Sequence, residues 1–174
     1  MPLIPALEPG AALTPAGDAT QAIAVSSTDA SGDALLPIDP FHVARIYGVP
    51  VFEYPLAPDL SGYLDWDSRG AFIVVNRHHG AVRQRFTVAH ELGHFYDAYR
   101  RNLPKIKKDR SDLASRDTDI EEIYANRFAA SLLMPADAVR TKFEVVRDVG
   151  ALARIFNVSE QAMSLRLRNL GLTA

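Results

Sequence analysis

The first regular pattern of apolar and polar positions lies between residues 38 and 76. Short apolar runs in "VFEY", "SGYLDWD" and "GAFIVVN" predict three strands, and the turn-forming residues 67–70 separate the last two. Upstream, "IDPFHVARIYGVP" predicts a short helix with Asp39 as its N-cap, Pro40 in its first turn and Gly48 at its end. We therefore expect a helix followed by a small sheet.

The period then becomes helical. From Arg83 to about Arg101, apolar residues recur every three or four positions, as one buried side of a helix requires. Residues 102–119 are polar and basic, contain a proline and predict a loop. "DIEEIYANRFAASLLM" predicts the next helix, with Asp119 and Glu122 spaced as a capping box, and Pro135 begins another.

The two ends of the chain differ from this middle part. Near the C-terminus, apolar residues before and after Asn157 and Ser159 outline two short helices joined by a turn, as in a helix-turn-helix unit. Residues 1–37 are rich in Ala, Pro, Gly, Ser and Thr, and they predict a flexible arm or an extended leader that packs on the domain. The expected division is an arm at 1–37, a core at 38–148 and a helical segment at 149–174.

Composition restricts the chemistry. The 174 residues are 48% apolar and 23% charged, with a net charge of −2, which gives no general attraction to nucleic acid or anionic membrane. Cysteine is absent, so any metal must be held by His, Asp or Glu. No apolar run is long enough for a membrane span, and the N-terminal residues lack the basic region of a signal peptide. We therefore expect a cytoplasmic protein.

The stretch "RFTVAHELGHFYDAYR" carries the main candidate site. His90 and His94 are four residues apart, so a helix places both rings on one face, where they could hold one zinc ion. Glu91 points round the helix toward the open side of such an ion. That position suits a general base acting on a water held there. The pattern also arises by chance, so its value depends on a third ligand.

The helix that contains "EEIYANRF" offers two acids as that ligand, Glu121 and Glu122. Glu122 is favoured because Asn126 follows it by one helical turn and could accept a hydrogen bond from a ligand histidine. Glu121 has only an alanine at the same spacing. The alternative is that Glu122 merely caps its helix.

Several other residues are candidates for contacting substrate or stabilising an oxyanion. His78 and His79 lie in the predicted turn before the site helix, although adjacent loop histidines are often simply solvated. Tyr63 could donate a proton to an oxyanion, and the sequence does not choose between it and the tyrosines at 96 and 124. Arg85 could line the cleft or pair with an acid.

Three blocks in order, "RQRFTVAHELGHF", "EEIYANRFAASLLMP" and "LARIFNVSEQAMSLRLRNLGL", resemble the ImmA/IrrE family of metallopeptidases from about residue 38 onward. The resemblance implies an α+β zincin-like core in which the site helix packs on a small sheet. It also implies that His90, His94 and Glu122 bind zinc and that Glu91 is the base. Manganese or iron also suits nitrogen and oxygen ligands.

Members of this family act as anti-repressors that cut a helix-turn-helix repressor, often one encoded alongside, and release stress-response or mobile-element genes. The resemblance therefore implies a zinc endopeptidase whose substrate is such a repressor. The alternative is a DNA-associated or toxin–antitoxin-type regulator with a structural or vestigial metal site. The apolar character of the C-terminal helices argues against direct DNA binding, although Arg154, Arg166 and Arg168 add local positive charge.

Overall fold

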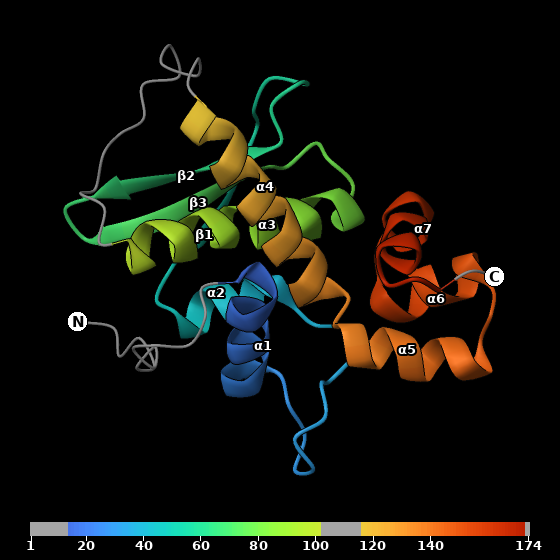
Figure 1. The fold of residues 1–174 in the computed structure, drawn as a ribbon. Coiled ribbons are helices and arrows are strands. Elements are labelled where there is room, and N and C mark those ends of the chain that lie inside the picture. The colour runs from blue at the N-terminus through green and yellow to red at the C-terminus, as the bar shows by residue number, and fades with distance from the viewer. Residues whose placement is uncertain (1–13, 102–115, 173–174) are drawn as a thin grey trace.

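The computed structural model describes residues 14–101 and 116–172. Within these ranges a three-stranded sheet and a set of helices follow one another along the chain (Figure 1). The elements are α1 (Pro15–Ser26), α2 (Pro40–Ile46), β1 (Val51–Tyr54), β2 (Gly62–Asp67), β3 (Gly70–Asn76), α3 (Ala81–Arg100), α4 (Arg116–Leu133), α5 (Ala136–Val145), α6 (Val149–Phe156) and α7 (Glu160–Asn169). The prediction of an α+β fold is confirmed.

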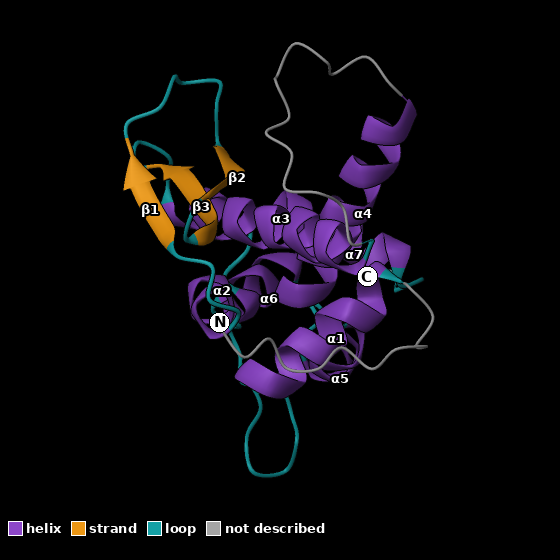
Figure 2. Ribbon diagram, turned by 90° about the vertical axis from the view of Figure 1, so that its left-hand side faces the viewer, coloured by secondary structure: helices purple, strands orange, loops and turns teal. Residues whose placement is uncertain are grey.

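The sheet has the strand order β1-β3-β2, with β1 parallel and β2 antiparallel to β3. The three strands form on the segments that the apolar runs predicted, and they lie on one side of the molecule (Figure 2). At Gly62, β2 comes very close to α3, because an added Cβ would lie 2.6 Å from Cγ2 of Thr87. The sheet therefore supports α3 directly.

Helices α3 and α4 cross at very short range. A Cβ added to Gly93 would lie 2.7 Å from Cα of Ala125, closer than real Cβ atoms approach a backbone. Leu92 and Phe128 are fully buried on either side of this crossing. The glycine therefore sets the separation of the two helices that carry the histidines and the glutamate.

The prediction of a flexible arm is wrong for residues 15–26, which form α1. Thr14 caps this helix by accepting a hydrogen bond from the N–H of Gly17 at 3.1 Å. Its buried side packs against α4 and consists of two alanines, one isoleucine and one acid: Asp18, Ala19, Ala22 and Ile23. Because this helix is rich in alanine, its sequence resembles a low-complexity segment and shows no helical spacing of large apolar residues. Residues 1–13 lie outside the described residues.

Asp18 is almost completely buried, with 1% of its surface exposed, and it joins three helices. It accepts a hydrogen bond from the hydroxyl of Tyr124 on α4 and forms an ion pair with Arg100 at the end of α3. Burial raises the pKa of its carboxyl, while Tyr124 and Arg100 act in the opposite direction. Asp18 thus ties α1 to both helices of the candidate site.

The expected start of α4 is also corrected. The helix begins at Arg116, so Asp119 and Glu122 lie inside it and do not form a capping box. The sequence at 116–119 contains no apolar residue that would reveal this first turn. Most of the predicted loop, residues 102–115, lies outside the described residues. Helix α5 begins one residue later than expected, with Pro135 as its N-cap.

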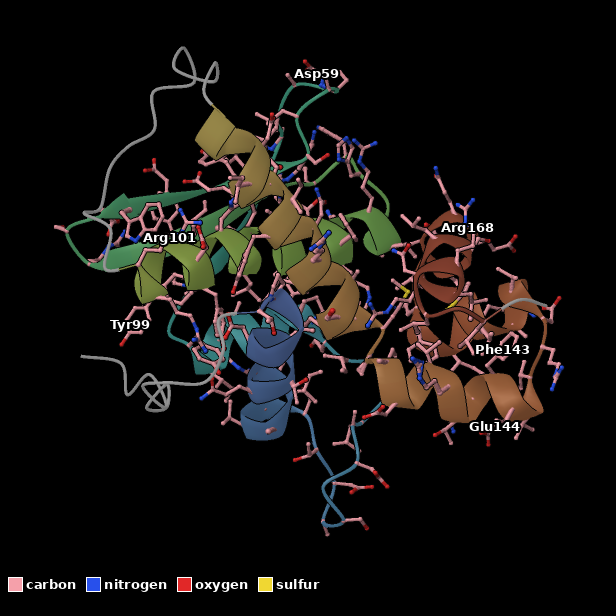
Figure 3. All side chains as sticks on the ribbon, viewed as in Figure 1. Asp59, Tyr99, Arg101, Phe143, Glu144 and Arg168 are labelled. Carbon is pink, nitrogen blue, oxygen red and sulfur yellow. The ribbon has the colours of Figure 1, made fainter. Side chains whose placement is uncertain are left out.

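The C-terminal helices have the predicted helix-turn-helix outline. Asn157 ends α6 in the left-handed region at φ 51°, and Ser159 caps α7 by accepting a hydrogen bond from the N–H of Ala162 at 3.1 Å. Phe143 points from α5 toward α6 and α7, while Glu144 points away from them (Figure 3). The apolar residues of α6 and α7 belong to the same buried cluster as the core of α3 and α4. None of the described helices has the length and apolar character needed to cross a membrane.

Candidate metal centre

Two helices far apart in the sequence bring three ligand atoms together. On α3, Nε2 of His90 and Nε2 of His94 are 3.0 Å apart. On α4, one carboxylate oxygen of Glu122 lies 3.3 Å from the first nitrogen and the other lies 3.1 Å from the second. The spacing of four residues and the choice of Glu122 over Glu121 therefore agree with the geometry, since Glu121 is not part of this group.

The three residues fit a divalent metal ion. Zinc with bonds near 2.0–2.1 Å to tetrahedral ligands requires ligand atoms about 3.3 Å apart. The two imidazole nitrogens are 3.0 Å apart, and each lies 3.1–3.3 Å from a different oxygen of Glu122, so the three residues are close enough to share one ion. The donor set of two imidazoles and one carboxylate is that of catalytic zinc sites rather than closed structural ones.

Asn126 orients the first histidine. Its side-chain oxygen lies 3.2 Å from Nδ1 of His90 and accepts the hydrogen bond of that nitrogen, which leaves Nε2 with a free lone pair. Burial lowers the pKa of His90, while Glu122 and the hydrogen bond to Asn126 oppose this shift. The ring is therefore turned with Nε2 toward the other two ligand residues, which is the orientation that can bind a metal.

Glu91 immediately follows His90 on α3 and is half-buried. One residue corresponds to about 100° of rotation round a helix, so Glu91 lies beside the triangle of ligand atoms without belonging to it. An acid in this place can accept a proton from a group bound next to the triangle. A site that only stabilised the fold would not need such an acid.

The weaker candidates have different positions. The Nε2–H of His79 donates to the carbonyl of Pro58 at 3.1 Å, and His78 is exposed in the same turn. Tyr63 is half-buried on β2. Of the two other tyrosines, Tyr96 is buried with only 1% of its surface exposed, and the hydroxyl at position 124 is occupied by Asp18.

Arg85 is fixed by the fold. Its guanidinium donates to the carbonyl of Ile38 at 2.6 Å and to that of Asn157 at 3.2 Å, so it connects α3 with two distant turns. These hydrogen bonds give Arg85 a structural role, and its contact with substrate stays a prediction. Among the arginines of the tail, Arg166 donates to the carbonyl of Met134 at 2.9 Å and is likewise engaged within the fold.

Sequence reasoning missed Asp18 and Arg100. Their ion pair joins residues 82 positions apart, and Asp18 lies in a segment without an apolar period. In the sequence, Asp18 is noticeable only as an acid in an alanine-rich segment, and this does not indicate which residue it pairs with. The pair links α1 to the end of α3, and neither residue belongs to the ligand group.

Comparison with known proteins places this geometry in a family. Residues 44–168 match the model of the IrrE N-terminal-like domain, Peptidase_M78. The chain belongs to the IrrE N-terminal-like domain family. This confirms the resemblance drawn from the three sequence blocks, and it gives the chain a metallopeptidase-type fold in which the three ligand residues are close enough to hold a metal.

One relative and one solved structure extend the comparison. The chain is 31% identical over 97 residues to immunity region protein 2 of Bacillus phage phi105, a match that covers 56% of this chain and 59% of that protein. A Mycobacterium tuberculosis transcriptional regulator has a similar fold, with a TM-score of 0.62 and 20% identity; the match covers 88% of this chain and 46% of the regulator. The chain thus spans about half the length of these two proteins, and the second likeness concerns the fold alone.

Proposed function

We propose that this IrrE-like protein is a zinc-dependent endopeptidase that acts in the cytoplasm on a protein substrate. The observation that carries the proposal is the triangle formed by His90, His94 and Glu122, with Glu91 immediately beside it. A structural or vestigial site would not require the adjacent acid. The enzyme reading is therefore favoured over a regulator whose metal only stabilises the fold.

The residues divide the work as follows. When bound, zinc supplies a Lewis acid that polarises a peptide carbonyl and lowers the pKa of a coordinated water to about 7. His90, His94 and Glu122 would hold the ion, and Asn126 would keep His90 in the tautomer that binds it. Glu91 accepts the proton of the attacking water and passes it to the leaving amine.

The proposed substrate is a helix-turn-helix transcriptional repressor whose cleavage releases stress-response or mobile-element genes. Two findings support this choice: the peptidase family of the chain, and the phage relative whose name places it in an immunity region. In this proposal the C-terminal helices contact the protein substrate. Direct DNA contact is not part of it, because Arg166 is already bound to the carbonyl of Met134.

The proposal is tested by the Glu91→Gln variant together with metal analysis. The purified protein is loaded with zinc and incubated with the helix-turn-helix repressor encoded beside its gene, and cleavage is followed by mass spectrometry. Glu91→Gln should keep one zinc per chain and lose about 10²- to 10⁴-fold in rate, the usual contribution of a general base. Glu121→Gln is the matched control, since this acid lies beside a ligand residue on α4 and outside the ligand group.

The two variants separate the possible outcomes. Equal cleavage by wild type and Glu91→Gln would show that the assigned base is wrong. Equal loss in both variants would show that the effect is a general consequence of removing an acid near the site. If the wild-type protein retains zinc and does not cut the repressor, the repressor is not its substrate.

A further inference from the structure

An apolar groove of about 680 Å³ lies where the first turns of α3 face the start of α7. The N-terminal end of α3 and the coil of α7 lie next to each other on one side of the molecule (Figure 1). Val82 and Phe86 of α3 line one wall, and Val158, Ala162 and Leu165 line the other. A volume of this size is within the range of sites that bind small molecules, so it leaves ample room for a large side chain of a substrate.

One residue of the groove also contacts the metal centre. Phe86 lines it and also stands one helical turn before His90, where the two rings have their centroids 6.4 Å apart. An extended polypeptide advances about 3.3 Å per residue. A chain whose scissile bond lies at the ligand triangle would therefore reach the groove within about three residues of the cut.

The walls of the groove select for apolar contact. Val82 is 37% exposed and Leu165 is 50% exposed, so both walls present large apolar side chains that the fold itself does not cover. Two polar groups at the rim are already used. The guanidinium of Arg83 donates to Oγ of Ser61 at 2.8 and 3.1 Å, and the Ser159 hydroxyl caps α7. Arg83 and Ser159 therefore do not select a polar ligand, and Gln161 is the remaining polar side chain of the lining.

We propose that this groove is a substrate subsite that takes one large apolar side chain, such as Leu, Ile, Met or Phe, within three residues of the scissile bond. The inference rests on the proposed peptidase function and adds to it the residues that choose the cleavage site. It also assigns a role to the C-terminal helices, because α7 provides half of the subsite. Leu165 and Ala162 are then specificity-determining residues on α7.

The test compares the cleavage-site profiles of the wild type and of a variant that carries a new positive charge in the groove. Wild-type protein is incubated with a mixture of peptides of diverse sequence, and the cut positions are read by mass spectrometry. One position within three residues of the cut should be enriched in large apolar residues. Leu165→Arg should lower kcat/KM for a peptide with Leu at that position by about 10- to 100-fold, since burying such a side chain contributes about 1.5–3 kcal/mol. The same variant should accept Glu there.

Val145→Arg is the matched control. Val145 is 85% exposed on α5 and does not line the groove, so the same substitution there should leave both the profile and kcat/KM unchanged. Circular dichroism and zinc content establish that both variants are folded and loaded. The gain of cleavage at Glu is a result that mere destabilisation would not produce. A profile without an apolar preference, or one that Leu165→Arg leaves unchanged, overturns the proposal.

Failure of the peptidase function is distinguishable from failure of the subsite. If zinc-loaded wild type cuts no peptide, the proposed function is wrong, and the groove is then tested by binding alone. Acetyl-Ala-Leu-Ala-amide is titrated into labelled protein and compared with its Ser analogue. Chemical-shift changes at Phe86, Ala162 and Leu165 with the Leu peptide alone support an apolar subsite, and their absence overturns it.

Discussion

Helix α3 makes two contacts of opposite character along its length. Near its middle, it crosses α4 so closely that Gly93 has no space for a side chain beside Ala125. At its N-terminal end, the same helix faces α7 across an apolar groove, with exposed Val82 and Leu165 on the two walls. Only about three helical turns separate Val82 in the open contact from Gly93 in the tight one.

The difference corresponds to two requirements of the proposed reaction. Ligand atoms must be held within tenths of an ångström, because metal bonds tolerate little variation in length. A subsite for substrate side chains must instead leave apolar surface uncovered until the substrate arrives. Close packing thus occurs where geometry determines chemistry, and incomplete packing occurs where recognition is expected.

Of the variants described here, Gly93→Val should disturb the close contact between α3 and α4 most strongly. The new side chain meets the backbone of Ala125, which cannot rotate away, so α3 and α4 must separate. We expect a loss of more than about 3 kcal/mol in the free energy of unfolding, the upper part of the range for overpacking. Zinc binding should disappear with it. Gly80→Val is the control, because a Cβ there meets nothing within 4 Å. Similar losses in both variants, measured by urea denaturation, would contradict the close-packing argument.

Asp18→Ala should have the next largest effect. It removes the partner of Arg100 and the acceptor of the Tyr124 hydroxyl in a buried place, which destabilises by about 3 kcal/mol, the lower end for broken buried pairs. Asp67→Ala is the control, because it removes an exposed ion pair with Arg69 and one hydrogen bond of the turn between β2 and β3, and it should lower the urea midpoint much less. Equal midpoints for Asp18→Ala and wild type would show that α1 is not anchored as described.

Asn126→Ala should have the smallest effect on the fold and a selective effect on the metal. Loss of the hydrogen bond to Nδ1 of His90 should weaken zinc binding by about 10- to 100-fold, as for other partners of ligand histidines. Competition with a chelating dye measures the affinity, and Arg127→Ala provides an exposed neighbour as control. An unchanged zinc affinity would mean that Asn126 does not orient the ring.

Local patterns in the sequence predicted the elements that local physics determines. The helix capped by Asp39 and the strands of the small sheet form where the apolar runs and turn residues indicated. The two histidines share a face because helical geometry alone requires it. Glu122 could be chosen over Glu121 because Asn126 follows at the spacing of one turn.

Features that depend on distant partners were not predictable in this way. Helix α1 is stabilised by contact with α4, and its alanines give no apolar period, so the sequence suggested an arm. Arg85 binds carbonyls that are 47 and 72 positions away, which no local pattern reveals. The groove likewise arises only when α7 is placed opposite α3, because neither helix is unusual alone.

Helix α1 has a practical consequence for anyone who shortens this protein. The family match starts at residue 44, after the helix has ended at Ser26, so a fragment cut at that boundary would retain every ligand residue and still lack Asp18. Arg100 would then lose the buried carboxylate that pairs with its charge. The face of α4 that packs against α1 would become exposed to solvent. Inactivity of such a fragment would report on its folding and would say nothing about the chemistry of the zinc ligands.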